Sequence, residues 1–171
     1  MTQITRASIE DIDSILYFIR ELAKYEKLEH EVVATPELLR QSLFGSQPAA
    51  EVVFLEISEN DGGKVKKKKV GFALFFTSYS TFLGRPGIYL EDLFILPEQR
   101  GHGYGKQLLA YLACLTRERG YGRLEWSVLD WNQPAIDVYL SIGAKPMSDW
   151  TVHRLTGDPL QQLADSLTAR T

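Results

Sequence analysis

Three glycines alternate with larger residues near the middle of the chain, at Gly101, Gly103 and Gly105, between the cations Arg100 and Lys106. The preceding run, residues 88–96, is apolar except for two acids, which predicts a buried strand. After the glycines, apolar residues recur at helical spacing. The expected order is therefore strand, basic glycine loop and helix. The first amides of a helix and a bare glycine backbone favour binding of a phosphate or pyrophosphate.

Spacing tests two nucleotide-binding interpretations of this loop, and a third interpretation needs no ligand. A P-loop needs four residues between its glycines and a hydroxyl residue after the lysine, whereas three residues separate Gly101 from Gly105, and Gln107 follows Lys106. A dinucleotide-binding fingerprint places its third glycine one residue later, and it remains a weak runner-up. A glycine-rich turn that binds no ligand is the third possibility.

Two adjacent carboxylates interrupt the predicted strand, Glu91 and Asp92, between Leu90 and Leu93. A carboxylate in the middle of a buried strand is costly unless it has a partner, which favours a functional site. Regular alternation along a strand predicts that the two side chains point to opposite faces.

The glycine loop resembles the R/Q-x-x-G-x-G/A signature of the GNAT superfamily, the acetyl-CoA-dependent N-acetyltransferases, as Arg100-x-x-Gly103-x-Gly105. Three further blocks resemble the diamine (spermidine/spermine) acetyltransferase family in order and spacing: ELAKYE at 21–26, YLEDLF at 89–94 and WNQPAIDVY at 131–139. The resemblance implies the α/β GNAT fold, a mixed α+β arrangement in which helices flank a central, mostly antiparallel sheet.

The resemblance also implies an activity, the transfer of acetyl from acetyl-CoA to a primary amine of a small cationic substrate, without metal or acyl-enzyme. The implied substrate is a polyamine, a diamine or a thialysine-like amino acid. Tyr139 is implied as the proton donor to the departing thiolate. Glu91 is implied to face the substrate and accept the proton of the amine through water, which leaves Asp92 a structural role.

Binding residues follow from the same correspondence. The residues implied to contact the cofactor are Leu93, Phe94, Ile95, Arg100, Gly101, His102, Gly103, Tyr104, Gly105, Lys106, Asn132, Gln133, Pro134 and Ala135. The residues implied to contact the amine are Tyr25, Glu26, Glu91, Glu125, Trp126, Ser127 and Asp149.

The chain departs from the animal members of that family at two places. They carry a basic pair, one residue of which contacts coenzyme A, where this chain has Ser141 and Ile142. Residues 145–150 form a shorter segment than in those members, so the correspondence of Asp149 is less direct. The first difference bears on affinity for coenzyme A and the second on the choice of amine substrate. Neither changes the expected reaction class.

Composition bounds the remaining possibilities. With 171 residues, 44% of them hydrophobic, the chain suits a single domain over residues 1–171, and one cysteine excludes an intramolecular disulfide. A net charge of -3 argues against general nucleic-acid binding and suits a cationic partner. The pattern shows neither a leader nor a long apolar run, so we expect no membrane association and a cytoplasmic location.

The spacing of apolar residues along the sequence predicts the helices and strands that position these residues. Helices are expected at residues 7–25, at 35–44 with Thr35 as the cap, from 104 to about 119, at 132–142 with Asn132 as a plausible cap, and at 158–167, the last docking inward through Leu160, Leu163, Ala164 and Leu167. Strands are expected at residues 1–6, 51–57, 70–79, 88–96, 123–129, 144–147 and 151–155. The lysine-rich segment 60–69, with its Asp61-Gly62-Gly63 turn, is expected to be a solvated hairpin tip.

Two other functions fit the same fold. A protein or peptide N-acetyltransferase requires an open groove, and a non-catalytic coenzyme A-binding module binds the cofactor without turnover. The resemblance further implies a homodimer.

Overall fold

A computed structural model describes residues 1–62 and 64–168 and divides the chain into two compact units, Met1–Leu129 and Asp130–Thr171. Gly63 of the predicted turn lies outside the described residues. Within the described part, no helix is both long enough and apolar enough to cross a bilayer.

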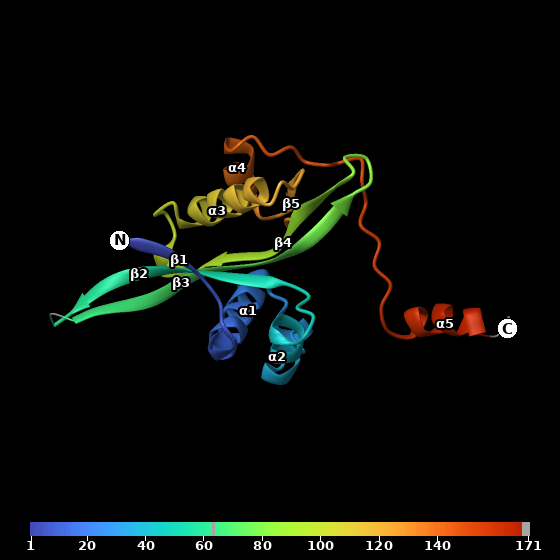
Figure 1. Ribbon diagram of the computed structural model, residues 1–171, viewed down its shortest axis with the longest axis horizontal. Helices are drawn as coiled ribbons and strands as arrows, with labels where there is room; N and C mark the ends of the chain where they lie inside the picture. Colours follow the sequence, from blue (N-terminus) through green and yellow to red (C-terminus); the bar gives the residue numbers. More distant parts are fainter. Residues whose placement is uncertain (63, 169–171) are drawn as a thin grey trace. The chain divides into compact units, whose positions relative to one another are not determined.

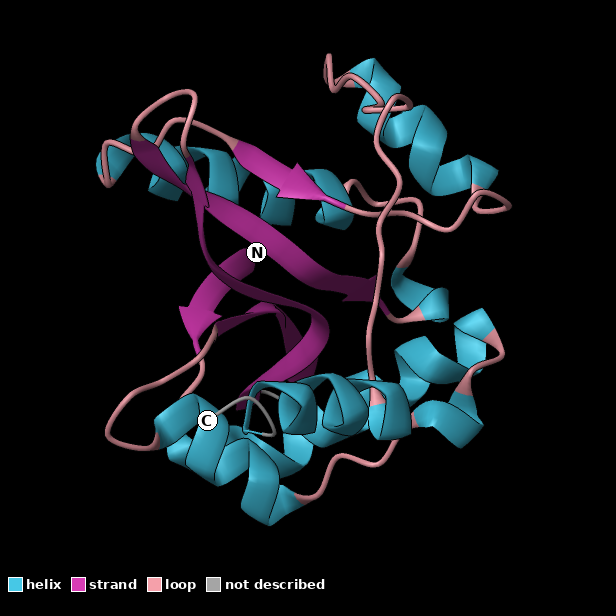
Figure 2. Cartoon of the chain, turned by 90° about the vertical axis from the view of Figure 1, so that its right-hand side faces the viewer, coloured by secondary structure: helices cyan, strands magenta, loops and turns pink. Residues whose placement is uncertain are grey.

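The described residues of the first unit form a sheet, drawn in magenta in Figure 2. Its five strands follow one another in sequence order. Its strands are β1 (Thr2–Arg6), β2 (Glu51–Asp61), β3 (Lys64–Ser80), β4 (Arg85–Ile95) and β5 (Leu124–Trp126). Neighbours from β1 to β4 are antiparallel, whereas β5 lies parallel to β4. The mixed α/β class with a mostly antiparallel sheet is therefore confirmed.

Helices cover both faces of this sheet. The helices α1 (Ile12–Glu26) and α2 (Pro36–Phe44) lie on one face, and α3 (Tyr104–Glu118) lies on the other (Figure 1). The apolar core under α1 and α2 contains Ile12, Ile15, Leu16, Phe18, Leu39, Leu43, Val52, Phe54, Phe72, Phe94 and Leu96. Toward α3, the buried residues include Leu108, Leu109 and Leu112.

Local chemistry explains where these helices begin. The Asp11 carboxylate accepts a hydrogen bond from the Ser8 amide at 2.8 Å, within a short 3-10 turn at Ile9–Asp11 that precedes α1. The Thr35 hydroxyl accepts one from the Leu38 amide at 3.2 Å, and Pro36 occupies the first turn of α2. Gly45 ends α2, in agreement with the predicted helix at 35–44.

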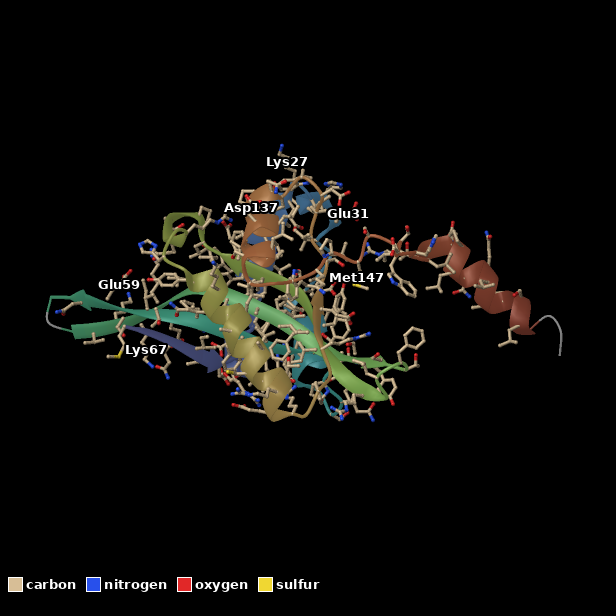
Figure 3. All side chains as sticks on the ribbon, turned by 90° about the horizontal axis from the view of Figure 1, so that it is seen from above. Lys27, Glu31, Glu59, Lys67, Asp137 and Met147 are labelled. Carbon is tan, nitrogen blue, oxygen red and sulfur yellow. The ribbon has the colours of Figure 1, made fainter. Side chains whose placement is uncertain are left out.

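The lysine-rich segment lies at the exposed end of the β2–β3 hairpin, as predicted, but the strands are longer than expected, because the lysines belong to β3, which continues to the turn. Acidic residues stand opposite them on β2, since Glu59 pairs with Lys66 and Glu56 with Lys69 in the ladder. Lys67 forms an ion pair with Glu56 at 3.8 Å. Figure 3 shows Glu59 and Lys67 near the end of this long hairpin. Cross-strand charge pairing makes a regular ladder possible where composition suggested a loop.

The second unit contains α4 (Gln133–Ser141) and α5 (Gly157–Thr168). The predicted helices are present, but residues 144–147 and 151–155, expected to be strands, have no regular structure. β-Strands require an edge to pair with, and no strand of this unit supplies one among its described residues. The predicted inward docking of the last helix is also wrong, because Leu160, Leu163 and Leu167 are 52%, 62% and 75% exposed.

Candidate active site

The glycine loop has the predicted position between β4 and α3. A short 3-10 turn, Pro97–Gln99, follows the strand, and α3 begins directly after Gly103. Gly101 and Gly103 have positive φ angles of 82° and 76°, which explains why glycine occupies both positions. A Cβ atom added at either position would meet nothing within 4 Å, so the backbone here is open to a ligand.

The first turn of α3 presents amides to this opening. Gln107 donates its backbone N–H to the Gly103 carbonyl at 3.1 Å, so the amides of Tyr104, Gly105 and Lys106 precede the first intrahelical bond. The His102 side chain lies against neighbouring residues of the loop. Its Nδ1 is 3.2 Å from the Gln99 carbonyl oxygen, and its ring stacks on the ring of Tyr104. Gly101, His102 and Gly103 are exposed. This helix N-terminus therefore has the geometry of an anion-binding site.

A β-bulge interrupts β4 beside the loop. Leu74 of β3 pairs with Asp92 and Phe75 pairs with Leu90, so Glu91 is the extra residue. On the other edge, the parallel pairing with β5 ends at Leu90 opposite Trp126. Strands β4 and β5 thus part at Glu91, and the edge of β4 beyond it, residues 91–95, has no strand partner on the β5 side among the described residues.

The three predicted cofactor-contacting residues of β4 lie on this segment. Phe94 and Ile95 are buried, and Leu93 is half-buried, with a terminal methyl group 3.8 Å from the position of a Cβ built on Gly105. The strand edge and the start of α3 are thus close neighbours.

The predicted substrate residues 125–127 lie beside β4 just before the bulge. Glu125 pairs with Tyr89 in the parallel ladder and forms a 2.6 Å ion pair with the Arg123 Nε. The hydroxyls of Ser127 and Tyr89 are 2.7 Å apart. Glu125 therefore already has a cationic partner in this structure.

The bulge brings Asp92 to the face that carries α1. Its ladder partner Leu74 packs against the core under α1, and Phe94, two residues farther along, belongs to that core. Burial, together with the negative charges of Glu91 and Glu26, raises the pKa of Asp92 to about 7. Burial also raises the pKa of Glu26, whereas Glu91 is exposed.

Tyr25, the other predicted substrate residue on α1, contacts both β4 and the loop. Its ring centroid is 6.1 Å from that of Phe94, and the Arg100 guanidinium carbon lies 4.4 Å from the Tyr25 centroid. Arg100 also donates from Nε to the Ile95 carbonyl at 3.1 Å. Its side chain is thus directed to the protein, although the sequence placed it among the cofactor contacts.

The second unit carries the remaining predicted residues. Tyr139 is half-buried on α4, and Asn132 precedes this helix with its carbonyl accepting from the Ala135 and Ile136 amides at 3.1 Å each. The Gln133 side chain donates to Asp137 at 2.7 Å, and Pro134 lies in the first turn. Asp149 is exposed in a segment without regular structure.

The first unit therefore gathers the glycine loop, the free edge of β4, Tyr25, Glu26 and the acidic pair of β4. The sequence did not point to Asp92 as a catalytic candidate, and it did not predict the contacts of the Arg100 side chain with Ile95 and Tyr25. The only available signal for Asp92 was the cost of a mid-strand carboxylate, because a bulge leaves no mark in the residue pattern.

Comparisons with known proteins agree with this geometry. The model of the acetyltransferase (GNAT) family matches residues 16–144, which includes residues of both units. A thialysine N-epsilon-acetyltransferase from Bos taurus is 38% identical over 164 residues, 94% of this chain and 96% of that protein. An L-ornithine N5-acetyltransferase from Arabidopsis thaliana is 34% identical and covers 95% of this chain and 87% of its own length.

Solved structures share the fold. An integron cassette protein from the mobile metagenome of V. cholerae superimposes with a TM-score of 0.73 and 26% identity, over 95% of this chain and 97% of that one. An aminoglycoside acetyltransferase from a soil metagenome has a TM-score of 0.67 at 19% identity, over 91% of this chain and 95% of its own.

Proposed function

This chain is an N-acetyltransferase of the GNAT family, and we propose that it transfers acetyl from acetyl-CoA to a primary amine of a small cationic substrate. The observation that carries the proposal is the open glycine loop beside a strand edge that loses its partner at Glu91. A pyrophosphate and the extended arm attached to it require these two features side by side.

The cosubstrate would be held mainly by backbone groups. The amides from Gly101 to Lys106 would bind the pyrophosphate, where the helix dipole also favours negative charge. The pantetheine arm would pair with the free edge of β4 at Leu93, Phe94 and Ile95 as an added strand. One of those amides would then donate to the oxyanion that forms on the thioester carbonyl. Asn132, Gln133, Pro134 and Ala135 complete the proposed cosubstrate contacts.

The reaction needs a neutral amine, because an ammonium with a pKa near 10 has no free electron pair. Once deprotonated, the amine attacks the thioester carbonyl carbon and forms a C–N bond while the carbonyl electrons move to oxygen. When the carbonyl reforms, the C–S bond breaks and the electron pair leaves with sulfur, while the nitrogen, cationic after the attack, releases its second proton to water and becomes the amide. We propose direct attack within a ternary complex.

Two carboxylates of β4 are the proposed acceptors of the amine proton. Glu91 is exposed at the bulge, where it would hold the ammonium. Asp92 lies on the face of the sheet that is covered by α1, the helix that carries Tyr25 and Glu26. Its pKa of about 7 suits a base that must be ionised yet able to take a proton at neutral pH. We propose that Asp92 shares this function with Glu91, either directly or through water.

Tyr139 is the proposed donor of a proton to the departing thiolate. A phenol keeps its proton at neutral pH and can donate it to a sulfur that develops negative charge. The family resemblance and the position of Tyr139 on α4 support the assignment. Substitution of Tyr139 by phenylalanine tests it.

The substrate class follows from charge and from the relatives. Glu26, Glu91 and Asp92 bring negative charge to one region, and Tyr25 adds an aromatic face that suits a cation. Relatives similar over most of this chain are described as acting on thialysine and ornithine, which are amino acids with a second, side-chain amine. We therefore propose the terminal amine of a basic amino acid or a diamine, with Glu125, Trp126, Ser127 and Asp149 as further contacts. A homodimer and a cytoplasmic location remain predictions from the resemblance.

A panel of amines tests the proposal. Purified protein, acetyl-CoA and either thialysine, lysine, ornithine, putrescine, spermidine or a lysine-containing peptide are mixed, and release of free thiol is followed. We expect turnover with at least one free amino acid or diamine and little with the peptide. Preference for the peptide would assign a protein N-acetyltransferase, and tight coenzyme A binding without turnover would assign a binding module.

A further inference from the structure

The Arg100 side chain joins three parts of the proposed site. Its backbone begins the glycine loop, its Nε donates to the Ile95 carbonyl at the end of β4 at 3.1 Å, and its guanidinium lies over two aromatic rings. The guanidinium carbon is 4.4 Å from the Tyr25 centroid and 5.2 Å from the Phe94 centroid. Arginine is suited to this position because its flat cation can stack on a ring while its edge donates hydrogen bonds.

Tyr25 needs such support because of where it lies. It is the penultimate residue of α1, and Lys27 ends the helix with a left-handed φ of 63°. Residues 27–31, which follow, are exposed. The contacts of the Tyr25 ring with Arg100 and Phe94 therefore hold the end of α1, and with it Glu26, against β4.

We infer that Arg100 is a positioning residue that couples the cosubstrate loop to the amine-binding end of α1, rather than a residue that binds the cosubstrate with its side chain. The inference rests on the proposed function of the loop and deepens it. If one contact orders both regions, a ligand that fixes the loop also fixes Tyr25, and each ligand then favours binding of the other. Tyr25 should therefore contribute to coenzyme A affinity without touching coenzyme A.

The test measures the dissociation constant of coenzyme A by calorimetry, with no amine present. The variants are Tyr25→Leu, which removes the ring, Tyr25→Phe, which keeps it, Arg100→Met and the double variant Tyr25→Leu/Arg100→Met. Arg117→Met is the charge control, because Arg117 is an exposed cation on α3. Thermal unfolding of each variant reports whether it is folded.

We expect Tyr25→Leu and Arg100→Met each to weaken coenzyme A binding about three- to fivefold, within the range of an exposed cation–π contact. Tyr25→Phe and Arg117→Met should stay within about twofold of the wild type. Because both single variants break the contact between Tyr25 and Arg100, the loss of affinity in the double variant should be smaller than the product of the two single losses. In steady state, Arg100→Met should also raise KM for the amine more than it lowers kcat.

The inference is overturned if Tyr25→Leu binds coenzyme A like the wild type, or if the two single effects multiply in the double variant. If Tyr25→Leu does not fold, Arg100→Lys decides: it keeps the charge but loses the flat stack, so wild-type affinity would overturn the inference, whereas several-fold weaker binding would support it. A wild type that binds no coenzyme A would refute the proposed function as well. A wild type that binds and turns over, with an unchanged Tyr25→Leu, refutes the coupling alone.

Discussion

Leu74 on β3 pairs with Asp92 on β4 across a bulge whose extra residue is Glu91. This register places Asp92 on the face of the sheet that carries α1 and Tyr25. The same bulge marks the point where β4 loses its pairing with β5. The bulge therefore sets the face to which Asp92 points and coincides with the place where the edge of β4 becomes free of β5. Bulges occur frequently beside active sites.

Asp92→Asn should lower kcat/KM by about a hundredfold or more if this carboxylate accepts the proton of the amine. In the wild type, kcat/KM should rise as the pH increases through about 7, since the base acts in its ionised form. In the variant, kcat/KM should show no plateau above pH 7 and should instead keep rising toward the pKa of the amine near 10, because only amine that is already neutral can then react. Asp13→Asn, at an exposed position on α1, is the matched control. Wild-type activity in Asp92→Asn would assign the proton transfer to Glu91 alone.

The same substitution should raise stability. Because the folded state raises the pKa of Asp92 from 3.8 to about 7, folding favours the protonated form, and the stability of the wild type falls as the pH rises between these values. Asparagine carries no charge, so Asp92→Asn should unfold at a temperature several degrees higher at pH 8 and with little difference at pH 4. Equal unfolding temperatures of the variant and the wild type at pH 8 would show that burial of the ionised Asp92 carboxylate does not destabilise the fold.

Gly103→Ala should weaken coenzyme A binding at least tenfold, because a methyl group would enter the mouth of α3 at a φ of 76°. Gly84→Ala is a matched control, since Gly84 also has a positive φ, 61°, and open surroundings, but lies in the turn before β4. Both variants should lose about 1 kcal/mol of stability. Calorimetry should show weaker coenzyme A binding by Gly103→Ala than by Gly84→Ala. Equal affinities of the two variants for coenzyme A would argue against the loop as the binding site.

Tyr139→Phe should lower kcat about tenfold to a hundredfold while the dissociation constant of coenzyme A changes little, because only a transferable proton is lost. Tyr111→Phe, on α3, controls for removal of a phenol hydroxyl. The rate of thiol release at saturating concentrations of acetyl-CoA and the best amine gives kcat. If kcat is unchanged, another group or solvent protonates the thiolate.

Arg119→Met should destabilise the first unit by about 1 kcal/mol, a value that allows for solvent screening of a partly exposed pair. Arg119 binds Glu51 through two hydrogen bonds of 2.6 and 2.8 Å and thereby ties the end of α3 to β2. This pairing lowers the pKa of Glu51, so its stabilisation is present above the ordinary pKa of 4.5 and is lost as the pH falls through the lowered value. The difference between variant and wild type should therefore shrink in acid, and a constant difference from pH 7 to pH 3 would contradict the charge-based account.

Most elements of the first unit were predictable because each carries a local signal. Apolar spacing marked α1 and α3, Thr35 and Pro36 marked the start of α2, and alternating glycines marked the loop. The lysine-rich part of β3 was not predictable from local preference, since acids on β2 stabilise it across the ladder. Residues 144–155 show the reverse case: alternation alone does not make a strand when no partner edge is present.

Site residues divide in the same way. The glycines, Tyr25 and Glu26 could be proposed from the sequence because they lie in contiguous motifs. Asp92 was assigned a structural role because regular alternation put it opposite Glu91, and only the register between β3 and β4 reveals the bulge. The contact between Arg100 and Tyr25 joins residues 75 positions apart in sequence, and no motif reports it.

The central claim is that backbone amides of the glycine loop and of β4 hold coenzyme A. Titration of ¹⁵N-labelled protein with coenzyme A, followed through its backbone amide resonances, tests this most directly. Saturable shifts should be largest at Gly101, Gly103, Gly105 and the adjacent residues Leu93–Ile95 of β4, with Gly84 unaffected. If coenzyme A shifts other amides while these stay in place, or if no saturation is reached at millimolar concentration, the claim is contradicted.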